Sequence, residues 1–100
     1  MNKIGVIGAG TMGNGIAHVS ALSGFETILM DIKDLFVSRG INTIRENLES
    51  QVKKEKISQP DMDASLGRIK TATDYTKVSE CDLVVETATE NEDIKINIFK

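Results

Sequence analysis

The sequence has no tryptophan, one cysteine and one proline, and its only aromatic residues are three phenylalanines and one tyrosine. A single cysteine, Cys81, forms neither an internal disulfide nor a cysteine metal site, which favours a reducing compartment, so we predict a cytoplasmic protein. We interpret Cys81 as a small buried residue at a strand start, in preference to a reactive thiol. The aromatic residues are not interleaved with basic ones as in proteins that stack on single-stranded nucleic acid.

Long hydrophobic runs and an excess of positive charge are missing as well. No apolar run approaches the roughly 20 residues that span a bilayer, and the net charge of −3 provides no basic field for nucleic acid. We therefore expect neither a membrane nor a nucleic acid as a partner. The chain begins in a strand-like pattern and not in a cleavable leader. Its 100 residues, 40% of them hydrophobic, suffice for one core, and we expect no second domain.

The most informative stretch is an apolar run at residues 4–7 that leads into closely spaced glycines. Gly8, Gly10 and Gly13 have the spacing G-x-G-x-x-G, and a helical pattern begins at about Thr11. In such a turn the first glycine permits the tight bend, the second lets a pyrophosphate approach the backbone, and the third lets the helix pack closely on the sheet. The start of the helix offers N–H groups and partial positive charge to phosphate oxygens.

A second predicted strand, residues 25–30, ends at Asp31, about 20 residues beyond the glycines. A carboxylate at this position accepts hydrogen bonds from both ribose hydroxyls of an adenosine and repels a 2′-phosphate, which favours NAD over NADP. The alternative is a plain glycine turn from strand to helix, with Asp31 merely capping the next segment of the chain.

Between these segments we predict a helix over residues 11–23, ended by Gly24 at the C′ position. His18 lies on this helix without an acidic residue in helical reach, so we interpret it as a surface or packing residue. A long helix comes after Asp31, with Asp34 as a possible N-cap and Gly40 as a bend or a joint between two helices.

The lysines at the end of that long helix have two interpretations. Lys53, Lys54 and Lys56 form a solvated helix face or, since a nucleotide site is expected, hold a second phosphorylated ligand. The only proline, Pro60, then breaks the helix, and one short turn over residues 61–66 ends at Gly67.

The last third of the chain predicts a strand at residues 68–73, a helical turn through Tyr75 and Val78, and a strand at residues 81–87. The latter is apolar at successive positions, as in a parallel strand buried on both faces. From Asn91 the chain predicts a helix with Ile94 and Ile98 at i and i+4, which still continues at the last residue.

These elements predict an α/β fold: a Rossmann-type doubly wound parallel sheet whose first four strands have the order 3-2-1-4, with helices on both faces. In this order the fourth strand is an edge, and an edge that is apolar on both faces is an aggregation liability. We therefore expect residues 1–100 to be the amino-terminal part of an incomplete domain from a longer chain.

Three segments together resemble the 3-hydroxyacyl-CoA dehydrogenases: GAGTMGNGIA at residues 8–17, DIKD at residues 31–34, and DLVVETATEN at residues 82–91. The resemblance covers the whole chain. It implies NAD as cofactor, an acyl-CoA substrate, and reversible hydride transfer between NAD and carbon 3 of the acyl group, in fatty acid and butanoate metabolism.

The resemblance also implies site residues. The pyrophosphate contacts are Gly8, Ala9, Gly10, Thr11, Met12 and Gly13, and the ribose contact is Asp31. Ala88, Glu90 and Lys95 match residues near the nicotinamide half of NAD, and Lys53 and Lys54 match lysines near the coenzyme A phosphates. The family's catalytic residues and its helical dimerisation domain lie beyond Lys100, so no catalytic residue is expected here. The parent enzyme is then a homo-oligomer.

Two other functions stay open. One is another dehydrogenase on this nucleotide fold, for a β-hydroxyacid or a sugar acid. The other is a non-catalytic module that binds NAD or assembles with partners. With the family's catalytic residues absent, we predict that the 100 residues alone have no dehydrogenase activity.

Overall fold

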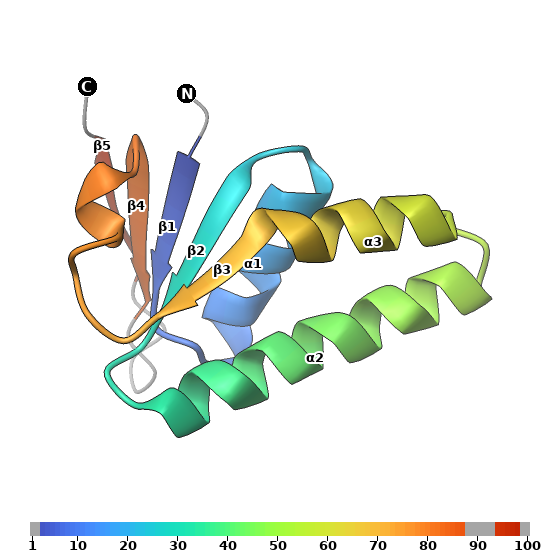
Figure 1. Cartoon of the computed structure of the whole chain (residues 1–100), viewed down its shortest axis with the longest axis horizontal. Helices are drawn as coiled ribbons and strands as arrows, with labels where there is room; N and C mark the ends of the chain where they lie inside the picture. Colours follow the sequence, from blue (N-terminus) through green and yellow to red (C-terminus); the bar gives the residue numbers. More distant parts are fainter. Residues whose placement is uncertain (1–2, 88–93, 99–100) are drawn as a thin grey trace.

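The computed structural model describes residues 3–87 and 94–98, and it is built on one five-stranded sheet (Figure 1). In chain order the elements are β1 (Lys3–Ile7), α1 (Thr11–Leu22), β2 (Glu26–Met30), α2 (Asp34–Lys53), α3 (Gln59–Arg68), β3 (Ile69–Ala72), the 3-10 helix η1 (Val78–Glu80), β4 (Leu83–Thr87) and β5 (Ile94–Ile98). The strand order is β3-β2-β1-β4-β5, and the first four strands are parallel, which confirms the predicted order 3-2-1-4.

The two faces of the sheet are covered unequally. Helix α1 packs on β1 and β2, and α2 and α3 pack against α1, so all three α-helices lie on one side (Figure 1). Their core contains the fully buried Val6, Leu29, Ile44 and Leu48. On the opposite side, the short helix η1 packs over β1, and a smaller cluster forms around Ile28. Helices thus occupy both faces, as predicted, but the second face has only one short turn within the described residues.

The prediction of a helix after Asn91 is wrong for residues 94–98, because these residues form the strand β5. β5 is antiparallel to β4, with Ile98 opposite Leu83 and Ile94 opposite Thr87. Isoleucine alternates with polar residues in this segment, a period of two that is typical of a strand, whereas the i, i+4 spacing of Ile94 and Ile98 fits either structure. β4 is therefore paired on both sides and is not the predicted edge strand.

The end of α1 agrees with the prediction, whereas the start of α2 does not. Gly24 has a φ of +102°, and the N–H groups of Gly24 and Phe25 bond back to Ala21 and Ser20, which makes the predicted C′ stop a Schellman motif. Asp34 is not the N-cap of α2, because Lys33 occupies that position and Asp34 is the first helical residue.

The helix after Pro60 is longer than predicted. Instead of one turn over residues 61–66, α3 runs from Gln59 to Arg68 and includes Gly67. Its start is a capping box: the Ser58 hydroxyl accepts from the Asp61 N–H at 3.2 Å, and the Asp61 carboxylate accepts from the Ser58 N–H at 3.1 Å. This reciprocal pair satisfies two backbone donors that would otherwise have no partner at the helix start.

Gly40 does not divide α2, which runs without a break, so the predicted joint is wrong. A Cβ at Gly40 would lie 2.6 Å from the Asn14 Oδ1 and 3.3 Å from the Ala9 Cβ. The glycine is therefore needed for close approach of α2 to α1. Nearby, His18 is 9% exposed and its Nε2 lies 2.9 Å from the Gln51 Oε1, which agrees with its interpretation as a packing residue.

Candidate functional site

The turn between β1 and α1 is held against the carboxyl ends of β2 and β4. The Gly8 N–H donates to the Met30 carbonyl at 2.8 Å, and Gly8 has a φ of +104°, a conformation that favours glycine. A Cβ at Gly8 would lie 2.5 Å from the carbonyl oxygen of Thr87. The Thr87 hydroxyl in turn donates to the Ile7 carbonyl at 3.1 Å. Any side chain at Gly8 would force this turn away from β4.

The third glycine brings the helix onto the turn itself. A Cβ at Gly13 would overlap the Gly8 carbonyl oxygen, and the Thr87 Oγ1 would be 3.2 Å away. Gly10 is the N-cap of α1, and neither a side-chain cap nor an acidic first-turn residue accompanies it in the described structure. The N–H groups at the start of α1 are therefore directed at the space beside the turn, with the positive end of the helix dipole.

Asp31 is brought to this turn by hydrogen bonds. Its Oδ2 accepts from the Ala9 N–H at 3.0 Å, its Oδ1 accepts from the Ile32 N–H at 2.8 Å, and its own N–H donates to the Ala72 carbonyl at 3.2 Å. The carboxylate is half-buried. Each carboxylate oxygen can accept a further hydrogen bond, so the group can accept from a ligand while it holds the turn. Asp31 does not cap the next helix, because the N-cap of α2 is Lys33 and, among the described residues, no side chain bonds to the start of that helix.

The other predicted cofactor residues lie in the turn, in α1, in β5 or outside the described residues. Ala9 is buried in the turn, Met12 is half-buried in α1, and Thr11 is the first residue of α1. Ala88 and Glu90 lie outside the described residues, and Lys95 is in β5, where the register places it opposite Glu86. Only Gly8 to Gly13 and Asp31 are therefore seen to come together.

Lys53 and Lys54 do not approach the glycine turn. Both are exposed at the far end of α2, a helix of 20 residues, so at 1.5 Å per residue they lie about 30 Å from its start beside Asp31. Of the two interpretations of these lysines, the structure shows the exposed helix end and leaves the second phosphorylated ligand a prediction.

Sequence reasoning missed Thr87. This residue ends β4, next to β1 in the sheet, and its backbone and hydroxyl oxygens contact the glycine turn. The signal was present: the carboxyl ends of neighbouring parallel strands meet at one edge of a sheet, so the last residue of β4 had to lie beside the end of β1. A threonine there is well suited to fix the backbone of the turn.

Three further findings concern the thiol, metal binding and membrane spans. Cys81 is buried, as predicted, and its burial raises the pKa of the thiol, while Lys3 opposes this shift and Asp82 and Glu80 add to it. Within residues 3–87 and 94–98, no group of three or more His, Cys, Asp or Glu side chains could hold a metal ion. In the same residues no helix has the length and apolar character to cross a membrane.

Comparison with known proteins matches residues 3–100 to the family described as 3-hydroxyacyl-CoA dehydrogenase, NAD binding domain. The chain is 46% identical over 99 residues to a 3-hydroxybutyryl-CoA dehydrogenase of Bradyrhizobium diazoefficiens, covering 99% of this chain and 34% of that protein. It is 45% identical over 98 residues to a probable 3-hydroxybutyryl-CoA dehydrogenase of Deinococcus radiodurans, covering 98% of this chain and 35% of that protein.

Among solved structures, the crystal structure of (S)-3-hydroxybutyryl-CoA dehydrogenase from Ralstonia eutropha matches with a TM-score of 0.86 and 42% identity, over 91% of this chain and 32% of that chain. A lactate dehydrogenase from Cryptosporidium parvum, with a TM-score of 0.58 and 22% identity over 89% of this chain and 26% of that one, shares the fold alone. The chain thus spans about a third of the length of the curated relatives it matches.

Proposed function

This chain belongs to the 3-hydroxyacyl-CoA dehydrogenase family, as its NAD-binding part, and from that premise we propose that the glycine turn and Asp31 hold NAD in a 3-hydroxybutyryl-CoA dehydrogenase. The observation that carries the proposal is the docking of the Asp31 carboxylate onto the Ala9 N–H, beside the start of α1. It places an acceptor for ribose hydroxyls next to donors for phosphate oxygens. These are the two recognition elements of an adenine dinucleotide.

The pyrophosphate would lie against Gly8, Ala9, Gly10, Thr11, Met12 and Gly13. The close packing of Gly13 on Gly8 supports this, because it keeps the start of α1 directly behind the turn and leaves no side chain between backbone and ligand. The free N–H groups of the first helical turn would donate to the phosphate oxygens.

The ribose of the adenosine half would lie against Asp31. Because this carboxylate already accepts from Ala9 and Ile32, its position is fixed before the ligand arrives, and its remaining acceptor sites suit two hydroxyl donors. A 2′-phosphate would place negative charge beside the carboxylate, so we expect discrimination against NADP.

The parent reaction would interconvert 3-hydroxyacyl-CoA and 3-oxoacyl-CoA, with bound NAD supplying the site that accepts or returns the hydride. The residues of this chain would bind and orient, since hydride transfer requires close and aligned carbon atoms. Ala88, Glu90 and Lys95 are proposed beside the nicotinamide half, and Lys53 and Lys54 near the coenzyme A phosphates. The catalytic residues would come from the part of the enzyme beyond these 100 residues.

The remaining properties of the parent enzyme are proposals as well. Residues 1–100 would be the amino-terminal part of the NAD-binding domain, followed by the rest of its sheet and a dimerisation domain, which the threefold greater length of the relatives supports. A homo-oligomer, a place in butanoate metabolism, and the cytoplasmic location expected from the buried single thiol complete the proposal.

The test is a titration of the chain with NAD and, in parallel, with NADP, followed by backbone amide chemical shifts. We expect saturable NAD binding with shifts centred on Gly8 to Gly13 and Asp31, and much weaker NADP binding. Asp31→Ala should lower NAD affinity by about tenfold, or ~1.4 kcal/mol, and so reduce the ratio of NAD affinity to NADP affinity. Asp63→Ala, an exposed carboxylate on α3, is the matched control and should leave both affinities unchanged.

Equal binding of NAD and NADP by the unmodified chain would contradict the role of Asp31. NAD shifts that spare the glycine turn would contradict the site itself. A separate assay with acetoacetyl-CoA and NADH should give no turnover above a blank, and any such turnover would contradict the placement of the catalytic residues beyond Lys100.

A further inference from the structure

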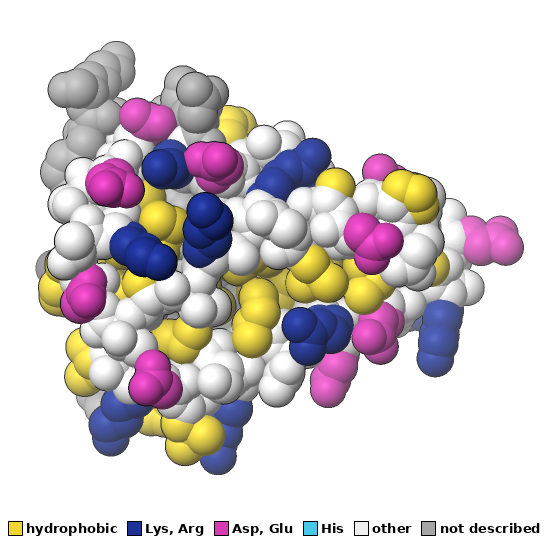
Figure 2. All heavy atoms as spheres, in the orientation of Figure 1, with side chains coloured by type: hydrophobic (Ala, Val, Ile, Leu, Met, Phe, Trp, Pro, Cys, Tyr) yellow, Lys and Arg dark blue, Asp and Glu magenta, His cyan; other side chains and the backbone are white. Residues whose placement is uncertain are grey.

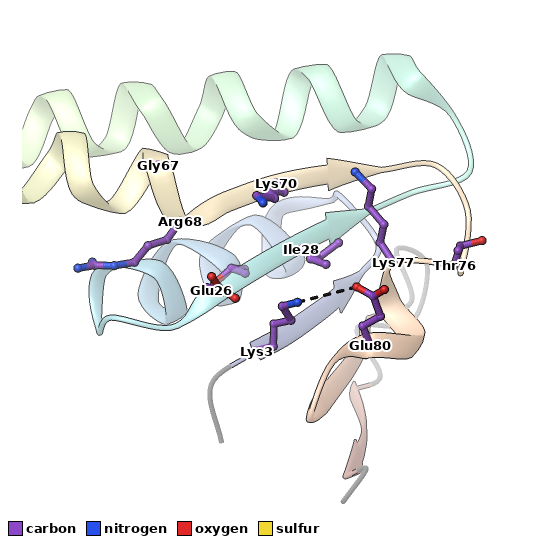
Figure 3. A pocket seen from close by; sticks show the side chains of 10 residues that line it. Lys3, Glu26, Ile28, Gly67, Arg68, Lys70, Thr76, Lys77 and Glu80 are labelled. Atoms are coloured by element: carbon purple, nitrogen blue, oxygen red, sulfur yellow. Dashed lines mark ion pairs between the residues drawn. The ribbon is translucent and has the colours of Figure 1, made fainter.

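A cavity lies on the side of the sheet opposite the three α-helices, near the amino ends of β1 and β2 (Figure 3). Its volume is about 450 Å³, within the range of small-molecule sites. Lys3 and Glu26, the first residues of β1 and β2, are part of its wall. The glycine turn and Asp31 lie at the opposite, carboxyl ends of these strands, so this cavity is distinct from the proposed NAD site.

The pleat of the sheet explains how the cavity forms. Ile69 is buried on the helix side of β3, so Lys70 projects from the other face, where its register partner on β2 is Ile28. The next position across the sheet is Gly5, which has no side chain. Helix η1 packs down onto that glycine, where an added Cβ would lie 3.2 Å from the Val78 Cγ1. Ile28, which is only 4% exposed, forms part of the cavity wall on this face together with Lys70 of β3 and Glu80 of η1.

The lining of this cavity is strongly cationic for an acidic chain. Lys3, Arg68, Lys70 and Lys77 contribute four positive charges against the two carboxylates Glu26 and Glu80, whereas the whole chain has a net charge of −3. On the strand side of the molecule, Figure 2 shows lysine and arginine side chains interspersed with acidic ones, so the excess of positive charge belongs to the lining of the cavity and not to the whole face.

Two of these four cations have partners. Lys3 pairs with Glu80 at 3.8 Å, and the Arg68 Nη1 donates to the Ala21 carbonyl at 2.9 Å. For Lys70 and Lys77, no ion pair with a carboxylate is found among the described residues. Figure 3 shows Lys77 extending from the segment before η1 toward β3, which carries Lys70. Both lysines are exposed residues in the wall of one cavity, and an anion bound between them would offset their mutual repulsion.

We propose that this cavity binds a small anion that carries phosphate groups, with Lys70 and Lys77 as its charged ligands. Ammonium groups form charge-assisted hydrogen bonds to phosphate oxygens, and a pyrophosphate or a nucleotide diphosphate supplies enough negative charge for both. Lys3 and Arg68 are less available to the anion, because Lys3 pairs with Glu80 and Arg68 donates to the Ala21 carbonyl. This site goes beyond NAD binding by the glycine turn and does not depend on it.

The test is a titration with inorganic pyrophosphate at low ionic strength, read from the backbone amides of Ile28, Lys70 and Lys77. We expect saturable shifts there, and weaker binding as salt is added. The double variant Lys70→Gln/Lys77→Gln should weaken binding by about tenfold. The matched double variant Arg45→Gln/Lys56→Gln removes the same charge from exposed positions outside the cavity and should bind nearly as well as the unmodified chain.

Three results would overturn the proposal: no saturable shift at the cavity, shifts confined to Gly8 to Gly13, or equal weakening in both double variants, which would mean that only the overall charge matters. A parallel titration with adenosine diphosphate identifies the source of the phosphate. Tighter binding than pyrophosphate indicates a nucleotide, and equal binding indicates recognition of the phosphates alone. The NAD titration is read at other residues, so failure of one proposal is distinguishable from failure of the other.

Discussion

Replacing Gly13 by alanine should destabilise the chain, whereas the same replacement at Gly15 should stabilise it. Both glycines lie in the first half of α1, two positions apart, so the change in covalent structure is identical. A Cβ at Gly13 would overlap the Gly8 carbonyl oxygen, but a Cβ at Gly15 would meet nothing within 4 Å. The contrast therefore measures the contact between helix and turn, with helix propensity held constant.

The magnitudes come from two opposing effects. Alanine in place of glycine inside a helix is worth about 1 kcal/mol, so Gly15→Ala should raise the free energy of unfolding by about this amount. At Gly13 the same gain is opposed by overpacking, which costs about 1–3 kcal/mol. Because the contacted atom belongs to the backbone of a turn tied to Met30, the cost should be near the upper limit. We expect the two variants to differ by about 3 kcal/mol.

Urea unfolding followed by circular dichroism measures this difference, and the NAD titration on the same variants connects it with function. Gly15→Ala should bind NAD like the unmodified chain, whereas Gly13→Ala should bind it more weakly, because α1 would have moved off the turn. Equal stability of the two variants would refute the close packing of Gly13 on Gly8. Unchanged NAD affinity in a destabilised Gly13→Ala would separate that packing from the proposed site.

Two further predictions concern stability. Ser58→Ala should lower the free energy of unfolding by about 1 kcal/mol, since it removes the cap of α3, and restored stability in Ser58→Asn would attribute the loss to capping. Burial raises the pKa of the Cys81 thiol above its ordinary value of about 9. The protonated thiol is thus favoured in the native state, and its contribution is complete below pH 9 and decreases as pH rises through the native pKa. Above pH 9, the urea midpoint of the unmodified chain should fall more steeply with pH than the midpoint of Cys81→Ala. Equal slopes for the two proteins would contradict the assignment of this pH dependence to Cys81.

Local patterns in the sequence were sufficient for much of the fold. The β-branched run before Gly8, the helical stripe on α1 and the stop at Gly24 each depend on neighbours in the chain, so their structure could be predicted from short segments. The parallel order of β1 to β4 could be predicted from the handedness of the crossovers. The prediction from local pattern was wrong for residues 94–98, because the spacing of Ile94 and Ile98 fits both a helix and a strand. Pairing with β4 decided in favour of the strand.

The candidate site divides in the same way. The glycine spacing and Asp31 were visible because each glycine meets a requirement of its own backbone, and the acidic residue ends a strand that its composition reveals. The resemblance added the residues near the nicotinamide and the lysines of α2, which stay predictions. Thr87 was not found, because its hydroxyl bonds to the carbonyl of Ile7, which is 80 residues away in the chain.

The sequence by itself thus determined the strand, turn and helix that begin the chain, and the position of Asp31 at the end of the second strand. These features arise from steric limits on the backbone and from the periods of helix and strand, which act over a few residues. Only the tertiary structure decided that Gly13 packs on Gly8, that the Asn14 side chain packs against Gly40, and that Lys70 and Lys77 line one cavity. Such contacts depend on how elements pack across the sheet, and packing is resolved only when all of them are in place.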